Sequence, residues 1–334
     1  MDDFEWTSTS IQKLFKLNLK NKQTLFNAEK RGEIPLSTRK ERGKTKVRLW
    51  KTEHLPQIGE KFGFIKKPST QKIICLYTAK GGVLKTTLAY NIARILALNG
   101  LKTLIIGLDI QCSITDICIP PIETENLEDP TEQPLGIYHI LYEKAPFENV
   151  IKHTNLPTLN VIPETPDLNV LEKKIRDEKR REYVLKDKII SNLSQYDIIV
   201  LDNSPSWNML IENALVAANI VISPVGCEIG TYHSLQTNLT TLHEFRETMK
   251  ISWNNFFLVP TLLEKTKLSQ QIYGAYLNEY KDNIIPNPIR RAVKGQEAIL
   301  LRKSIIEHDV NSPLSQDYFE LMVALWSKIS CEKF

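Results

Sequence analysis

The sequence predicts an α/β fold, built on a doubly wound and mainly parallel sheet, with a small basic domain at the N-terminus. Short apolar runs near residues 73, 104, 159, 198, 220 and 257 alternate with segments of helical length, which is the pattern of βα units. The first 70 residues carry 16 lysines and arginines against 8 acidic residues, whereas the rest of the chain is slightly acidic. A length of 334 residues accommodates both parts. We therefore expect a small domain over residues 1–68 and an α/β domain over residues 69–334.

The composition is that of a globular protein, with 42% hydrophobic and 25% charged residues. The sequence has no run of about twenty apolar residues and no basic leader followed by an apolar segment, so we expect a soluble, cytoplasmic protein. Its five cysteines are scattered without C-x-x-C spacing, which argues against a zinc site and a disulfide framework.

The most informative stretch reads A-K-G-G-V-L-K-T-T over residues 79–87, between an apolar run at Ile73–Tyr77 and a helix-like segment at Leu88–Leu98. A strand that feeds a glycine-containing turn and then a helix directs backbone N–H groups and the positive end of the helix dipole at one point, which suits a phosphate. Lys85 adds a positive charge, and the Thr86 hydroxyl stands where a Mg²⁺ ligand is needed. The alternative is an ordinary glycine turn between a strand and a helix.

The strict pattern G-x-x-x-x-G-K-[ST] is not met, because Ala79 and Leu84 stand where it has glycines. The form K-G-G-x-x-K-[ST]-T, with a second lysine at the start of the loop, fits better and resembles the ParA/MinD family of deviant Walker ATPases. The resemblance implies ATP, ADP and Mg²⁺ as cofactors, and a dimer in which Lys80 reaches the ATP of the partner subunit. It also implies that the nucleotide is held by Lys80, Gly81, Gly82, Val83, Leu84, Lys85, Thr86 and Thr87.

Two acidic residues follow predicted strands downstream of this loop. Asp109 ends an apolar segment, and an acid at that position is suited to orient the water that attacks the γ-phosphate. The segment 107–111 resembles the family motif D-x-D-P-Q, although Gly107 replaces the first aspartate. Asp202 ends a buried-strand pattern within residues 196–205, which resembles the family's Walker B region and implies a role near Mg²⁺. The alternative for Asp109 is a helix cap or a solvated turn, and the alternative for Asp202 is a core strand with a terminal cap.

The resemblance covers roughly residues 72–327. Ile285 and Pro286 resemble the family's last strand and the loop after it, which implies that Pro286 helps to enclose the adenine. The resemblance implies three catalytic residues, Lys80, Lys85 and Asp109, and two residues that hold the metal, Thr86 and Asp202.

In the basic segment, Ser10–Leu17 and Lys22–Arg31 have short helical patterns, with Gly32 as the C-cap of the second. A charge-dense stretch followed by β-favouring residues indicates a hairpin, and we expect Thr52 to cap a third helix. This order resembles the MerR-type winged helix-turn-helix, whose second helix enters the major groove. The resemblance implies base contacts by Lys22, Gln23, Thr24 and Asn27 and phosphate contacts by Arg39, Lys40, Arg42 and Lys44. A solvated basic surface is the alternative.

A second basic group lies near the C-terminus and comprises Arg290, Arg291, Lys294, Arg302 and Lys303. We expect these side chains to be mostly unpaired by nearby acids. Basic residues of this region bind DNA without sequence preference in partition relatives, so the resemblance implies the same role here. Such contacts neutralise phosphates and weaken steeply with salt.

Together these features predict an ATP-dependent DNA partition ATPase of a plasmid or similar replicon. The resemblance implies that it dimerises on ATP, binds non-specific DNA over the nucleoid, is stimulated by a ParB-type partner, and binds an operator through its N-terminal domain. A nucleotide-responsive transcriptional regulator with little hydrolysis is the alternative, because Leu84 and Gly107 depart from the motifs. A MinD-like membrane ATPase needs a basic amphipathic C-terminal helix, but Tyr318–Lys328 has Lys328 as its only cation, so we expect no membrane binding.

Overall fold

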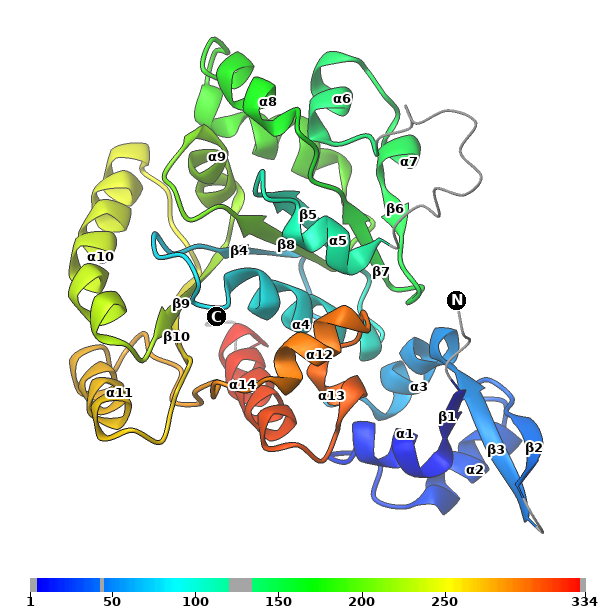
Figure 1. The fold of residues 1–334 in the computed structure, drawn as a ribbon. Helices are drawn as coiled ribbons and strands as arrows, with labels where there is room; N and C mark the ends of the chain where they lie inside the picture. The colour runs from blue at the N-terminus through cyan, green and yellow to red at the C-terminus, as the bar shows by residue number, and fades with distance from the viewer. Residues whose placement is uncertain (1–4, 43–44, 120–133, 331–334) are drawn as a thin grey trace.

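The computed structural model describes residues 5–42, 45–119 and 134–330, without the side chains of Arg42 and Thr45, and shows a sheet with helices on both faces (Figure 1). Its strands are β4 (Lys72–Leu76), β5 (Thr103–Leu108), β6 (Lys152–His153), β7 (Leu159–Ile162), β8 (Ile198–Asn203), β9 (Ile220–Gly226) and β10 (Asn255–Thr261). They lie in the order β10-β9-β4-β8-β5-β7-β6, and every neighbouring pair is parallel except β6 with β7. The predicted doubly wound, mainly parallel sheet is confirmed.

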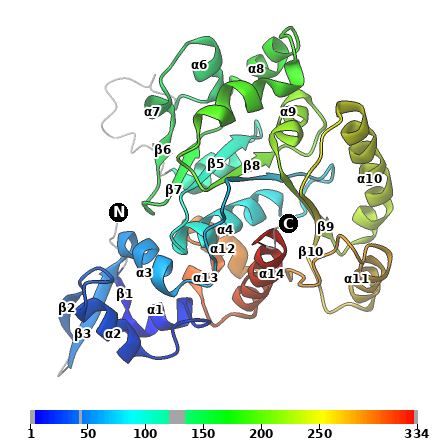
Figure 2. The same ribbon diagram turned by 180° about the vertical axis from the view of Figure 1, so that it is seen from behind.

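Each face of the sheet is covered by its own helices (Figures 1 and 2). One face carries α4 (Lys85–Leu98), α12 (Lys294–Leu300), α13 (Ile305–His308) and α14 (Pro313–Ser330). The other carries α6 (Ile137–Tyr142), α8 (Leu168–Ile175) and α9 (Met209–Ala217). Two long helices, α10 (Ile229–Met249) and α11 (Lys267–Glu279), lie near β9 and β10, and two short ones are α5 (Ser113–Cys118) and α7 (Phe147–Val150).

The central strands are buried on both faces, which explains their uninterrupted apolar runs. In β8, Ile198 and Val200 belong to the cluster that includes α4 and α14, called here the main hydrophobic cluster. Ile199 and Leu201 belong to the second cluster, which includes α8 and α9. Because successive side chains of a strand point to opposite faces, one strand supports both layers.

The N-terminal part comprises β1 (Glu5–Thr7), α1 (Ser8–Leu14), α2 (Lys22–Lys30), β2 (Thr38–Arg42), β3 (Thr45–Lys51) and α3 (Leu55–Phe62). Its strands form an antiparallel sheet in the order β1-β3-β2. Two helices, a hairpin and a third helix therefore occur in the predicted order. The DNA-binding role of this part and a domain boundary at residue 68 stay predictions.

Local hydrogen bonds determine where these helices begin and end. The Thr7 hydroxyl accepts a hydrogen bond from the backbone N–H three residues on, so α1 begins two residues earlier than predicted. After α2, Gly32 has the left-handed φ of 69° that is typical of a C-cap glycine. The prediction for Thr52 is wrong, because a 3-10 turn (Thr52–His54) precedes α3 and the Thr52 hydroxyl accepts a hydrogen bond from the Trp6 indole at 3.1 Å.

The N-terminal part packs directly against the α/β part. In α3, Gly59 approaches the end of α4 so closely that a Cβ would lie 1.8 Å from the carbonyl oxygen of Leu98. The Asn99 side-chain oxygen accepts hydrogen bonds from two backbone N–H groups after α3, at 2.7 and 3.2 Å. The Trp326 indole of α14 donates to the Lys66 carbonyl at 2.9 Å. Because side chains of both parts belong to the main hydrophobic cluster, the two predicted domains share a core.

We expect Gly59→Ala to lower the free energy of unfolding by about 1–3 kcal/mol, since the added methyl group would force α3 away from α4. Urea denaturation measures this loss. Gly274→Ala in α11 is the matched control, because no atom lies within 4 Å of the Cβ position. That variant should be unchanged or up to about 1 kcal/mol more stable. Equal losses in both variants would contradict the close contact.

The last predicted strand, at Ile285, is not a strand. The structure has only isolated bridges around it among the described residues, Leu258 with Ile284 and Leu263 with Arg290. Prolines at positions 286 and 288 have no N–H group, so this segment cannot extend a ladder along β10.

The segment Tyr318–Lys328 lies within α14, as expected for a docked helix. Tyr318, Leu321 and Leu325 are buried in the main hydrophobic cluster. Within the described ranges, no helix has the length and the apolar character of a membrane span.

Candidate functional site

The glycine loop leaves the carboxyl end of β4, a central strand between β8 and β9, and leads into α4 (Figure 1). The chain passes from β4 to the β8–β5 side and later crosses to β9 on the other side. In open parallel sheets, ligands bind in the crevice at such a switch point. Lys85 is the first residue of α4, so the loop presents a helix N-terminus at this place.

At Leu84, where the strict pattern G-x-x-x-x-G-K-[ST] has a glycine, the backbone of the loop still adopts a conformation typical of glycine. Gly82 has a φ of 76° and Leu84 a φ of 66°, both in the left-handed region. A side chain in this region costs about 1–2 kcal/mol. The Leu84 side chain is partly buried against the main hydrophobic cluster, and this burial offsets part of the cost.

The ends of neighbouring strands hold the loop in place. At the end of β10, the Thr261 hydroxyl donates to the Val83 carbonyl at 3.1 Å. In β8, the Asn203 amide donates to the Leu76 carbonyl at 3.0 Å. The sheet therefore holds the loop at Val83 and holds the last residue of the strand before it.

Open space lies over the glycines of the loop. A Cβ at Gly81 or Gly82 would have no atom within 4 Å, and both residues are exposed. Lys80 is exposed as well, and its Nζ lies 3.9 Å from the Cβ position of Gly230 in α10. This space suits a phosphate group, which a side chain in place of either glycine would obstruct.

The structure brings together three of the predicted side chains, Lys85, Asp109 and Asp202. Lys85 is only 8% exposed. Burial lowers its pKa, and the nearby charges of Asp202 and then Asp109 raise it. One buried ammonium near two carboxylates leaves a net negative charge, which a bound cation would compensate.

Asp202 is a fully buried acid whose carboxylate oxygens lack hydrogen-bond partners in the described part of the chain. Burial raises the pKa of Asp202 to about 7, an increase that the Thr86 hydroxyl and the Lys85 ammonium oppose. An orphaned buried carboxylate is costly unless a cation or a donor satisfies it.

These residues fit Mg²⁺ bound together with a nucleotide. Within residues 5–42, 45–119 and 134–330, no three His, Cys, Asp or Glu side chains are grouped as a self-sufficient metal site. Beyond Thr86 and Asp202, the ligands would be phosphate oxygens and water, which is the environment that Mg²⁺ prefers.

Asp109 lies on the turn between β5 and α5 and is 8% exposed. Its carboxylate accepts the Gln111 N–H at 3.1 Å, and its carbonyl accepts the Cys112 N–H at 3.1 Å. Cys112, with a φ of 54°, occupies the N-cap position of α5. Asp109 is therefore neither a helix cap nor a solvated turn residue.

Glu164 was missed by the sequence interpretation. It follows β7, is 1% exposed, and lies beside Gly107 at the end of β5. Burial raises the pKa of Glu164 to about 8, and the charge of Asp202 adds to the rise. The available signal was an acid just after an apolar strand, as at Asp109 and Asp202, but no motif includes it.

Pro286 is exposed on the segment beside β10. Its carbonyl oxygen accepts a hydrogen bond from the Tyr273 hydroxyl at 3.4 Å. An adenine contact by Pro286 stays a prediction.

The residues of the N-terminal part that are predicted to contact DNA differ in exposure and in whether their side chains already have partners. On α2, Lys22, Gln23 and Asn27 are exposed, whereas the Thr24 hydroxyl donates to the N-cap residue at 3.0 Å. On β2, Arg39 is exposed and the Lys40 ammonium pairs with Glu5 at 2.7 Å. The Arg42 side chain and Lys44 lie outside the described residues.

The expectation that the second basic group is mostly unpaired is wrong. Three of its members form ion pairs: Arg290 with Asp317, Arg291 with Glu228 and Glu264, and Lys294 with Asp309. Arg302 is partly buried: its Nε is buried, and the residue lines a cavity of about 180 Å³ together with Tyr90 and Arg94. The acids come from elements distant in sequence, so local charge counting missed them. DNA contacts there stay a prediction and would have to displace these pairs.

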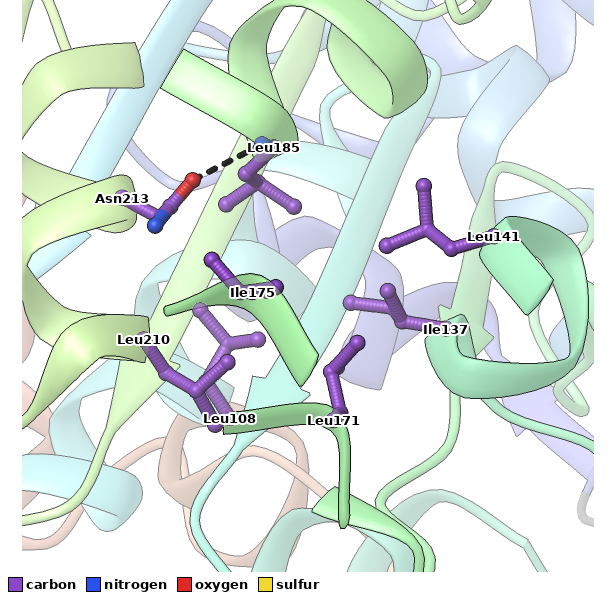
Figure 3. A pocket seen from close by; sticks show the side chains of 8 residues that line it. All are labelled: Leu108, Ile137, Leu141, Leu171, Ile175, Leu185, Leu210 and Asn213. Carbon is purple, nitrogen blue, oxygen red and sulfur yellow. Dashed lines mark hydrogen bonds between the residues drawn. The ribbon is translucent and has the colours of Figure 1, made fainter. Parts of the chain in front are cut away.

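The apolar pocket under α6, α8 and α9 is a packing void rather than a ligand site (Figure 3). Leucine and isoleucine side chains converge on it, and the one polar residue among the described residues that line it, Asn213, accepts the Leu185 N–H at 2.9 Å. Its volume of about 10 Å³ is at the lower limit for a single water, which would find few polar partners.

The chain is similar to known proteins in sequence and in fold. The family model described as "AAA domain" matches residues 71–255. The chromosome partitioning protein ParA of Myxococcus xanthus is 28% identical over 251 residues, which cover 75% of this chain and 86% of the relative. The sporulation initiation inhibitor protein Soj of Bacillus subtilis is 30% identical over 251 residues, with 75% and 96% covered. A putative plasmid partition protein from Borrelia burgdorferi, solved bound to AMPPNP, shares the fold with a TM-score of 0.65 at 24% identity, over 78% of this chain and 100% of that one.

Proposed function

The chain belongs to the ParA/MinD family of deviant Walker ATPases, and we propose that it is a DNA partition ATPase whose bound nucleotide switches its association with DNA. The observation that carries the proposal is the convergence of Lys85, Asp109 and the orphaned Asp202 at the glycine loop. The partitioning role named for ParA supports it, as does the AMPPNP bound by a protein of the same fold.

In the proposed reaction, water attacks the γ-phosphate of ATP and yields ADP and phosphate. Backbone N–H groups of the loop and the Lys85 ammonium hold the phosphates, while Asp109 orients the attacking water. Thr86 and Asp202 would hold Mg²⁺, which neutralises phosphate charge when bound. The protein thus supplies positioning and electrostatics rather than a covalent intermediate.

We propose that two subunits meet through the face that carries the loop. Lys80 is exposed there beside the start of α10. Ile110, next to Asp109, is 46% exposed, and Ile229, next to Gly230, is 53% exposed. Exposed apolar side chains beside polar ones suit an interface. In the dimer, Lys80 would reach the nucleotide of the partner.

Lys80→Ala should weaken ATP-dependent dimerisation about tenfold or more, because truncating one partner of a buried charge pair costs a few kcal/mol. Sedimentation with ATP and with ADP measures the effect. Lys102→Ala is the control, since Lys102 is exposed just before β5, at the opposite end of that strand. A Lys80→Ala protein that dimerises on ATP as well as the Lys102→Ala protein would exclude the lysine from the interface.

DNA binding in this proposal has two components. The exposed Lys22, Gln23 and Asn27 of α2 would contact the bases of an operator. Non-specific DNA would bind to the ATP-bound dimer, and a ParB-type partner would stimulate hydrolysis and release.

The test of the function is ATP turnover with and without DNA and the partner protein of the same replicon. A marked rise in turnover with both additions is expected. Operator binding by a protein with no turnover under any of these conditions would favour the transcriptional regulator instead.

A further inference from the structure

Glu164 lies where the end of β7 meets the end of β5. The two strands are parallel neighbours, with Ile106 paired to Ile162. Glu164 comes two residues after Ile162, and its side chain passes Gly107 near the end of β5 and reaches the first turn of α5. It is 1% exposed, and the roles described above do not use it.

Glu164 and a side chain at position 107 exclude each other. A Cβ at Gly107 would lie 2.2 Å from Glu164 Cγ and 2.6 Å from its carboxyl carbon. Non-bonded heavy atoms do not approach this closely, so a side chain at position 107 requires the Glu164 side chain to move out of its present place. The chain lacks a carboxylate at position 107 of β5, and the glutamate after β7 places one in the same space.

Glu164 holds the first turn of α5 in place through hydrogen bonds. Its Oε2 accepts hydrogen bonds from the Ile114 N–H at 3.1 Å, the Thr115 N–H at 3.2 Å and the Thr115 hydroxyl at 3.2 Å. In return, the Glu164 N–H donates to the Thr115 hydroxyl oxygen at 2.7 Å. These residues lie in the first turn of α5, directly after the turn that contains Asp109. Its Oε1 is buried and has no partner in the part of the chain that the structure describes.

We propose that Glu164 is the positioning residue for Asp109, and that Gly107 is the substitution that gives it room. Glu164 fixes the first turn of α5, and this turn fixes the short segment on which Asp109 lies. The predicted effect on turnover rests on the proposed ATP hydrolysis, whereas the predicted effects on structure do not. Displacement of a catalytic group by about 1 Å lowers turnover by up to ~10²-fold.

Glu164→Ala should lower kcat about tenfold to a hundredfold and change KM for ATP less than about threefold, because the phosphate loop is untouched. Amide exchange at Ile114 and Thr115 should accelerate about tenfold or more. Glu164→Gln should restore kcat to within about threefold of the original protein, since its carbonyl oxygen accepts the same hydrogen bonds. Glu148→Ala, at an exposed position of α7, is the control.

Two results would overturn the positioning role. One is unchanged amide exchange in Glu164→Ala. The other is a Glu164→Gln protein as slow as Glu164→Ala, which would show that the negative charge itself is required. An unmodified protein without turnover would instead refute the proposed function, and amide exchange would still decide whether Glu164 fixes α5.

The shared space is tested by a pair of substitutions. Gly107→Asp should lower the melting temperature by roughly 5 °C or more, because the new side chain collides with Glu164. Adding Glu164→Ala should raise the melting temperature above that of Gly107→Asp alone, since the collision with Glu164 is removed and only the close approach to Ile114 Cγ2, at 2.7 Å, remains. Additive losses in the double variant would overturn the claim that the two positions compete for one space.

Discussion

Lys85→Ala is expected to lower ATP turnover about a hundredfold or more, because a preorganised charge that stabilises the transferred phosphoryl group is worth roughly 10²–10³ in kcat. Lys85 is the first residue of α4, is nearly buried, and is close enough to Asp202 and Asp109 for their charges to raise its pKa. Steady-state phosphate release measures the loss. Nucleotide affinity should fall as well, since the same ammonium holds the β- and γ-phosphates.

Lys102→Ala is the matched control for this substitution. It removes one exposed lysine from the opposite end of β5 and should leave turnover unchanged. If Lys85→Ala and Lys102→Ala hydrolysed ATP equally well, the glycine loop would not be the catalytic site.

Asp202→Asn is expected to abolish the dependence of nucleotide binding on Mg²⁺. At alkaline pH it should also stabilise the protein that holds neither nucleotide nor metal, which is unusual for a substitution in an active site. Burial raises the folded-state pKa of Asp202 to about 7, above the ordinary value of about 4 for an unfolded chain. The protonated form is therefore favoured by folding. Its contribution to stability is complete below pH ~4 and is lost as the pH rises through ~7.

The amide of Asp202→Asn does not ionise, so it avoids this loss. At pH 8 without nucleotide or metal, the variant should exceed the original protein in unfolding free energy by about 1–3 kcal/mol, a difference that should shrink toward pH 5. Thermal denaturation over this pH range measures the effect. Asp282→Asn, at an exposed position, should show no such trend. A stability difference independent of pH would contradict an ionised, unpartnered Asp202.

Parts of this architecture follow directly from local sequence. The continuous apolar run of β8 predicts a strand buried on both faces, and its residues do alternate between the main and the second hydrophobic clusters. The glycine loop was predictable as well, because strand, turn and helix are contiguous there. Leu84 fits despite the missing glycine, because the backbone adopts a φ of 66° and the side chain packs on the core.

Other features depend on which elements become neighbours. Glu164 belongs to the site only because β7 lies beside β5 in the sheet. The local hydrophobic pattern predicts each strand but does not predict which strands become neighbours. Arg290 looked unpaired because its acid, Asp317, lies 27 residues away on α14. The packing of α3 on α4 at Gly59 is likewise a tertiary contact that local sequence does not predict. Removal of the N-terminal part would expose the hydrophobic core that it shares with the α/β part, so substitutions are a better test of its role than truncation.

The most direct test of the central claim is retention of the 334-residue chain on a non-specific DNA duplex with ATP, with ADP and without nucleotide, at two salt concentrations. The proposed switch predicts retention that requires ATP, falls steeply with salt, and persists in Gln23→Ala and Asn27→Ala. Retention that is indifferent to nucleotide and is lost in the two α2 variants would contradict it, and would identify α2 as the DNA-binding element of a regulator.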